Sequence, residues 1–284
     1  MKKILVPVVT PFKENQEIDY DALKKLVKKI LSEGADGIYA GGSSAECFSL
    51  TQEEKKNTLE TVVNAAEGAY VIAHIGAPSS YLAQDLARHA KQLGVNELAS
   101  VPPIYFKYSI NEIKSYYEDI YAASELPIMM YSISNAGYNF DLKDYYTLLR
   151  DSYIKSLKFT IKDYYILERL KANTDKIIFN GVDECLLGAL VQGADGAIGT
   201  TYNFMLSTAR NIAENCEKDL LFAEKEQDKI CRVVEEIFCP FGGIAATKYI
   251  LSLQGINAGR CRAPFKTLNP EEKKSIEKII KTIL

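Results

Sequence analysis

The 284-residue sequence has no tryptophan and only two histidines, and none of its apolar runs approaches the roughly 20 residues that span a bilayer. His74 and His89 have no second imidazole or thiolate at metal-ligand spacing, so we expect no metal centre. We interpret His74, within YVIAHIG, as a core or strand-end histidine rather than a catalytic base. The start MKKILVPVVTPF has a short apolar stretch containing Pro7 and no cleavage site of small residues, which favours a strand over a secretion signal and predicts no membrane partner.

The charges are nearly balanced and the cysteines are dispersed. The 34 Lys and Arg residues face 37 Asp and Glu residues, with a net charge of -3 and no basic stripe, so we expect no nucleic-acid partner. A hydrophobic content of 47% makes a disordered chain implausible. The cysteines lack paired short spacings, which favours free thiols in a reducing, cytoplasmic setting. They are Cys47, Cys185, Cys216, Cys231, Cys239 and Cys261.

Short apolar or β-branched runs recur about every 30 residues, with segments of helical periodicity between them. The runs cover residues 4–9, 37–42, 70–76, 97–103, 127–133, 154–160, 177–181 and 196–202. Eight such repeats predict an α/β fold of the TIM (β/α)₈ barrel type. The alternative is an open doubly wound sheet, but no G-x-G-x-x-G motif opens its first unit.

Helix signals lie between these runs and after the last of them. Leu23, Leu26, Val27 and Ile30 share one face of a predicted helix over 20–31. A second helix is predicted over 52–66, where Thr51 and Glu54 are spaced as a capping box. From about residue 204 the pattern is wholly helical, with breaks at 239–243 and 263–264. We therefore predict one domain over 1–284, in which 1–203 form the barrel and 204–284 supply its remaining helix and a helical C-terminal extension.

A parallel barrel carries its active site at the carboxyl ends of its strands, so polar residues at those ends are the candidates for chemistry. The candidates are Ser43, Ser44, Tyr105, Tyr131, Lys158, Thr160, Asp183, Glu184, Thr200 and Thr201. Lys158 is distinctive because IKSLKFT otherwise has the character of a buried strand, where an ammonium ion is costly. Burial favours a neutral lysine amine, the form that attacks a carbonyl to make a Schiff base. The alternative is that Lys158 points outward into solvent.

The other candidates each have a functional and a structural interpretation. GGSSAE at 41–46 can bind an anion through backbone amides and hydroxyls, or can be an ordinary loop. Tyr131 can relay protons or simply pack in the core. Asp183 and Glu184 can bind substrate hydroxyls or begin the helix that runs through Cys185. The residues themselves leave these alternatives open.

Together the motifs resemble the N-acetylneuraminate lyase branch of the dihydrodipicolinate synthase and N-acetylneuraminate lyase family, along essentially the whole chain. The motifs are VPVVTPF, DGIYAGGSSAECFSLT, VIAHIG, YSI, SLKFTIKDYYILERL, FNGVDE and GADGAIGTTYN. The resemblance implies a TIM barrel with a helical extension, commonly a homotetramer, that needs no cofactor beyond its own lysine. It implies a carbon–carbon lyase that cleaves N-acetylneuraminate reversibly to N-acetylmannosamine and pyruvate.

Site roles follow from the same resemblance. Lys158 matches the Schiff-base lysine and Tyr131 the proton-transferring tyrosine, and Tyr105 resembles a tyrosine near a subunit contact. The remaining matches are expected to bind substrate: Ser43 and Ser44 at its carboxylate, Thr160 near the lysine, and Gly181, Asp183, Glu184 and Thr200 along its hydroxylated tail.

Three departures from the family pattern bear on substrate preference. Ala45 replaces a usual glycine, which preserves the loop if the backbone there has no positive φ. After Tyr131, Ser132-Ile133-Ser134 replaces the usual Asn-Ile-Pro, and the loop through 135–137 is shorter. Ile161 replaces a frequent serine. The expected partner is thus a small 2-oxo sugar acid, with the exact acid left open.

Other functions remain possible on the same scaffold. One alternative is an aldolase or dehydratase for another 2-oxo sugar acid, and another is 4-hydroxy-tetrahydrodipicolinate synthase. Against the second, residues 131–142 contain no arginine for a second substrate carboxylate. A non-catalytic sugar-acid sensor is disfavoured because both Lys158 and Tyr131 are present.

Overall fold

The computed structural model describes residues 2–284 and contains a closed barrel of eight parallel strands, each hydrogen-bonded to its sequence neighbours, with β1 paired to β8. The TIM barrel predicted from the eight runs is therefore confirmed. The strands are β1 (Lys3–Pro7), β2 (Gly37–Ala40), β3 (Val71–His74), β4 (Glu97–Ser100), β5 (Ile128–Ile133), β6 (Ile154–Thr160), β7 (Ile177–Asn180) and β8 (Gly196–Ile198).

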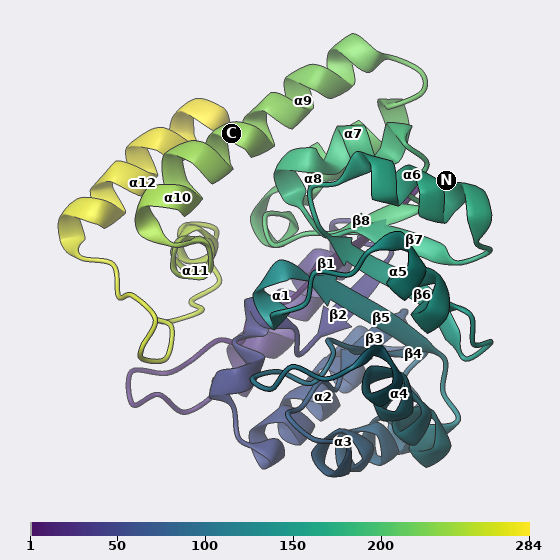
Figure 1. Ribbon diagram of the computed structural model, residues 1–284. Helices are drawn as coiled ribbons and strands as arrows, with labels where there is room; N and C mark the ends of the chain where they lie inside the picture. The colour runs from purple at the N-terminus through teal and green to yellow at the C-terminus, as the bar shows by residue number, and fades with distance from the viewer. Residues whose placement is uncertain (1) are drawn as a thin grey trace.

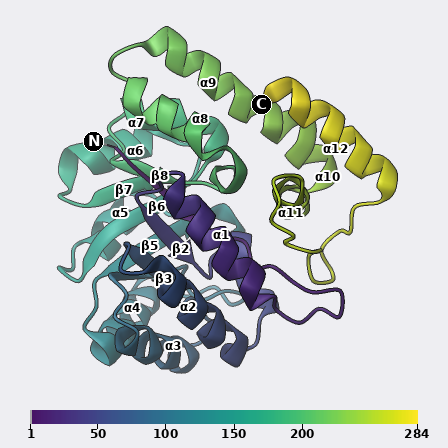
Figure 2. The ribbon, with the colours of Figure 1, turned by 180° about the vertical axis from the view of Figure 1, so that it is seen from behind.

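Eight helices alternate with the strands and surround them, as Figures 1 and 2 show from opposite sides. They are α1 (Tyr20–Ser32), α2 (Gln52–Ala66), α3 (Ser80–Gln92), α4 (Ile110–Ser124), α5 (Leu142–Leu149), α6 (Tyr164–Asn173), α7 (Leu186–Val191) and α8 (Tyr202–Asn215). Helix α2 has the predicted bounds, and its capping box between Thr51 and Glu54 is formed. Local sequence thus determines where this helix begins.

Side chains alternate between two apolar layers along each strand, because successive strand residues point to opposite faces. In β2, Ile38 and Ala40 pack outward against the helices, whereas Tyr39 packs inside the barrel. In β6, Leu157 and Phe159 likewise belong to the outer layer. This alternation directs Lys158, which lies between them, into the barrel interior.

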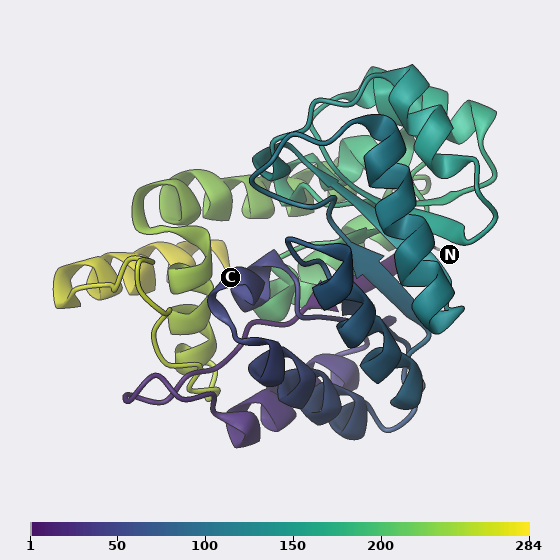
Figure 3. The same ribbon diagram turned by 60° about the horizontal axis from the view of Figure 1, so that its bottom comes forward.

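The C-terminal extension gathers on one side of the barrel in both views and projects from it in Figure 3. It comprises α9 (Leu220–Val233), a π turn (Val234–Phe238), α10 (Cys239–Phe241), α11 (Gly243–Leu253) and α12 (Pro270–Ile283). Helix α12 packs against α9 and α11. Among residues 2–284, no helix is long and apolar enough to cross a membrane.

The prediction of a wholly helical tail was wrong over residues 254–269. That segment has no helix, although only a short break at 263–264 was expected. Gly255 and Gly259 both have positive φ, which ends α11 and turns the chain. At Gly259 the backbone passes so close to Phe12 that an added Cβ would lie 1.8 Å from the Phe12 carbonyl oxygen. The segment therefore lies against the connection between β1 and α1, where it meets the barrel.

Candidate active site

Lys158 is only 4% exposed and lies inside the barrel near its carboxyl end. Its Nζ is 4.2 Å from the centre of the Tyr131 ring and 4.7 Å from that of Tyr39. The two aromatic faces enclose the Lys158 amino group within the barrel. The Lys158 side chain therefore points into the barrel, which excludes the alternative in which it points outward into solvent.

Tyr131 lies directly beside Lys158, because the two residues are register partners in the pairing of β5 with β6. The Tyr131 ring is buried and packs edge-on against the rings of Tyr39 and His74. Its hydroxyl is 3.5 Å from the Ser43 hydroxyl, and either atom can be the donor. Tyr131 thus packs in the core and also presents its hydroxyl to the loop after β2.

The loop after β2 contains a 3₁₀ turn over Ser43–Ala45. Gly42 faces the Tyr39 ring so closely that a Cβ would lie 2.5 Å from it, which explains the glycine here. Ala45 is in the turn and Glu46, with φ 58, is the residue that takes the left-handed conformation. The condition that lets alanine replace glycine at 45 is therefore met. The Thr10 hydroxyl donates to the Ala45 carbonyl and fixes the turn from β1's side.

His74 supports the same loop from the end of β3. Its Nδ1 is 2.9 Å from the Gly41 carbonyl, an arrangement in which a neutral ring donates its Nδ1 proton. Burial lowers the pKa of His74 to about 3, with nearby Lys55 adding to the effect. A histidine held neutral in this way orients Gly41 and is poorly suited to general-base work near neutral pH.

Ser44 and Thr200 join the loop after β2 to the end of β8, through hydroxyls 2.7 Å apart. Thr200 also lines a cavity of about 570 Å³ at the ends of β5 to β8. Five predicted substrate-binding residues line this cavity, namely Thr160, Gly181, Asp183, Glu184 and Thr200. The other four predicted site residues are linked to one another or to it: Ser44 by its bond to Thr200, and Ser43, Tyr131 and Lys158 by the contacts described above.

Gly181, which directly follows β7, is in close contact with Thr160 at the end of β6. A Cβ at residue 181 would lie 1.9 Å from Thr160 Oγ1 and 3.2 Å from Lys158 Cε, so only glycine leaves both side chains in place. Thr160 Oγ1 is buried without a hydrogen-bond partner within residues 2–284. A buried hydroxyl of this kind at a cavity wall is available to a ligand.

Asp183 and Glu184 have different surroundings. Asp183 is 7% exposed, and its Oδ2 accepts a 2.7 Å hydrogen bond from the Thr201 N–H. Burial raises the pKa of Asp183 to about 6, although the hydrogen bond from Thr201 opposes the shift. Glu184 forms a 2.8 Å ion pair with the exposed Lys162. Asp183 and Glu184 form the 3₁₀ turn Asp183–Cys185 that leads into α7, so they do begin that helix. Asp183 also connects this turn to the residue before α8 by accepting the Thr201 N–H.

Sequence reasoning missed several residues of the site. Tyr39 forms the second ring beneath Lys158, and burial raises the pKa of its hydroxyl well above the usual range. Val234 and Phe238 line the cavity from the π turn of the extension, and Asn135 does so from the altered loop after β5. The β2 run indicated that Tyr39 is in a strand, but no local signal points from residue 234 or 238 to a site formed more than 30 residues earlier.

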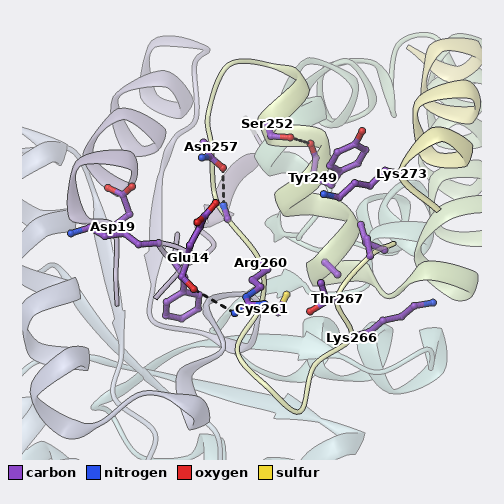
Figure 4. A pocket seen from close by; sticks show the side chains of 15 residues that line it. Glu14, Asp19, Tyr249, Ser252, Asn257, Arg260, Cys261, Lys266, Thr267 and Lys273 are labelled. Carbon is purple, nitrogen blue, oxygen red and sulfur yellow. Dashed lines mark hydrogen bonds between the residues drawn. The ribbon is translucent and has the colours of Figure 1, made fainter. Parts of the chain in front are cut away.

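Two observations delimit the site. Residues 2–284 hold no cluster of three or more His, Cys, Asp and Glu side chains placed to bind a metal ion. A second cavity, of about 560 Å³, lies between the β1–α1 connection and the extension and includes Glu14, Arg260 and Lys273 (Figure 4). None of the nine predicted site residues lines it.

Tyr105 projects away from the barrel, 90% exposed with φ 82, and packs edge-on against Phe106.

Comparison with known proteins identifies the family and similar structures of the whole chain. The model of the dihydrodipicolinate synthetase family matches residues 1–283. The N-acetylneuraminate lyase of Fusobacterium nucleatum is 36% identical over 278 residues, which cover 96% of this chain and 95% of the relative. A crystal structure of an N-acetylneuraminate lyase from Fusobacterium nucleatum has a TM-score of 0.94 at 34% identity, covering 100% of this chain and 99% of the other. A Clostridium difficile protein in complex with mannosamine gives 0.93 at 30% identity, with the same coverage.

Proposed function

Because the chain belongs to the dihydrodipicolinate synthetase family, we propose that it is an N-acetylneuraminate lyase that works through a Schiff base on Lys158. The observation that carries the proposal is the buried Lys158 amine, which lies 4.2 Å from the ring of a tyrosine whose hydroxyl faces the Ser43 turn. A class I aldolase needs these three parts together: a nucleophilic amine, a proton relay and a carboxylate site. Relatives that are 34% to 36% identical carry the name of this activity.

The first step joins substrate and enzyme. The Lys158 amine attacks the C2 ketone of open-chain N-acetylneuraminate, and loss of water gives a protonated imine. The Ser43 and Ser44 turn binds the adjacent C1 carboxylate through its hydroxyls and backbone N–H groups. The imine cation is then the electron sink for bond cleavage.

Cleavage follows from the position of Tyr131. Its hydroxyl relays the proton from the C4 hydroxyl, the C3–C4 bond breaks, and its electron pair enters the imine to form an enamine. N-acetylmannosamine leaves as the aldehyde product. The proton taken from the C4 hydroxyl is returned to C3 of the enamine, and water hydrolyses the imine to pyruvate and free Lys158.

The cavity at the ends of β5 to β8 fits the hydroxylated tail of such a substrate. It presents polar atoms from Thr160, Asp183, Glu184 and Thr200, and Gly181 allows close approach to the backbone. Carboxylates accept hydrogen bonds from sugar hydroxyls, whereas they repel a second substrate carboxylate. This supports a sugar acid over an aspartate-semialdehyde-derived intermediate.

The chemistry uses no cofactor beyond Lys158, and we propose a homotetramer that acts in the cytoplasm. All six cysteines are free thiols, which supports a reducing setting. The exposed aromatic pair of Tyr105 and Phe106 supports a subunit contact, because such side chains gain from burial against another chain.

Pyruvate release from N-acetylneuraminate tests the proposal directly. Borohydride reduction in the presence of pyruvate is expected to attach the three-carbon unit to Lys158, as found by peptide mass analysis. Condensation of pyruvate with aspartate semialdehyde provides the competing assay. The assignment would be overturned if another residue were labelled. It would also be overturned if the protein condensed pyruvate with aspartate semialdehyde but released no pyruvate from N-acetylneuraminate.

A further inference from the structure

Glu46 and Lys248 form an ion pair in which both side chains are fully buried. The two charged atoms are 2.5 Å apart, although the residues are 202 positions apart in the sequence. Glu46 directly follows the Ser43–Ala45 turn, and Lys248 lies on α11 of the C-terminal extension. The pair therefore connects the loop after β2 to the extension through the interior of the protein.

Further contacts enclose both charges. The second Glu46 oxygen accepts a 2.8 Å hydrogen bond from the Arg262 N–H. Lys248 Nζ also donates to the Arg260 carbonyl at 3.4 Å and lies 4.2 Å from the centre of the Phe12 ring. Phe12 and Arg260 also line the second cavity, in which Figure 4 labels Arg260. Both charges are thus held inside the protein by defined partners.

The backbone of Glu46 transmits this restraint to the turn. Glu46 is in the left-handed conformation, with φ 58 and ψ 37. This conformation is unfavourable for a residue that has a side chain. Its N–H donates to the Ser43 carbonyl at 3.0 Å, and its own carbonyl accepts from the Ser49 N–H at 2.8 Å. A change in the Glu46 side chain is therefore expected to move or loosen the turn that carries Ser43 and Ser44.

We propose that Glu46 and Lys248 are positioning residues that hold the Ser43–Ser44 turn in its carboxylate-binding geometry, so that the C-terminal extension controls substrate affinity at the barrel mouth. The inference rests on the proposed function of that turn. Neither residue contacts substrate. Their effect is on the binding of the carboxylate, which is the same in the ground state and the transition state, so KM changes more than kcat.

The double variant Glu46→Gln/Lys248→Met separates positioning from folding. A single Lys248→Met change leaves Glu46 buried without its partner, which destabilises the fold. Replacing both charges removes that penalty, and glutamine can still accept from the Arg262 N–H. We expect the double variant to regain folding stability relative to Lys248→Met, while its KM stays raised by about tenfold and its kcat changes less.

Two control variants separate the loss of an ion pair as such from a general loss of stability in the extension. Glu125→Gln removes a solvent-exposed pair with Lys91 and should leave stability and KM unchanged. Ile276→Val trims a fully buried side chain of α12 and should lower stability without raising KM. A rise in KM with Ile276→Val equal to that of the double variant would overturn the inference, because any weakening of the extension would then suffice.

Amide hydrogen exchange in residues 41–50 provides a readout that does not require turnover. The double variant should exchange faster there, with β5 to β7 unchanged. If residues 41–50 of the double variant exchange at the same rate as in the wild-type protein, the positioning role is overturned, whatever activity the wild-type protein has. Absence of pyruvate release by the wild-type protein overturns the proposed function instead, so the two failures are distinguishable.

Discussion

Tyr131 and Lys158 are register partners on adjacent strands, and the Lys158 amine lies over the Tyr131 ring with 4.2 Å between nitrogen and ring centre. The backbone pairing of β5 with β6 thereby fixes the nucleophile relative to the proton relay. A barrel strand is a rigid support, so little reorganisation is needed before reaction.

Lys158→Met should abolish turnover without unfolding the protein. Activity should fall by about 10³-fold or more, because the amine that forms the imine is gone. The free energy of unfolding should not decrease, since an apolar side chain of similar length replaces a buried polar amino group between Tyr39 and Tyr131. Lys155→Met is the matched control, because Lys155 is exposed on the same strand. Substantial residual activity in Lys158→Met, measured as pyruvate release, would contradict the assignment.

Tyr131→Phe should separate imine formation from bond cleavage. The ring and its packing remain, so borohydride trapping of pyruvate on Lys158 should persist. Loss of the proton relay should lower kcat for cleavage by about 10²- to 10⁴-fold. The control is Tyr165→Phe, a change at a largely exposed tyrosine of α6. An unchanged kcat in Tyr131→Phe would assign the relay to another group.

Local signals explain why much of the fold could be predicted. The capping box of Thr51 and Glu54 and the alternation around Lys158 are encoded within a few residues. The tail between 254 and 269 was mispredicted because glycines with positive φ override a helical pattern. Glu46 with Lys248, and Asp183 with the Thr201 N–H, are pairs formed by tertiary packing. No window of the sequence contains both members of the first pair, so its existence could not be predicted.

Asp183 should make folding stability depend on pH between about 4 and 6. Its folded pKa is about 6, above the usual 3.8, so the folded state binds more protons in this range. The stabilisation of the folded state that comes from this raised pKa is fully present below about pH 4 and is lost as the pH rises through 6. A difference of about two pH units corresponds to about 3 kcal/mol of unfolding free energy.

Asp183→Asn tests this contribution. The amide oxygen can still accept from the Thr201 N–H, but the side chain no longer titrates. The unfolding free energy of the wild type minus that of the variant should therefore decrease as the pH rises from 4 to 7, as measured by denaturant titrations at several pH values. A constant difference would mean that the carboxyl does not titrate in this range.

Gly181→Ala should disable the site through steric contact with Thr160 rather than through loss of a functional group. The added methyl would lie 1.9 Å from Thr160 Oγ1 and 3.2 Å from Lys158 Cε, so both side chains must move. Because a small misplacement of a reacting group costs a large rate factor, kcat should fall by about 10²-fold. Adding Thr160→Ala removes the closest atom and should restore part of the activity, whereas Thr160→Ala alone tests the hydroxyl itself. If the double variant is no more active than Gly181→Ala, contact with Thr160 is not the cause, and displacement of Lys158 alone would account for the loss.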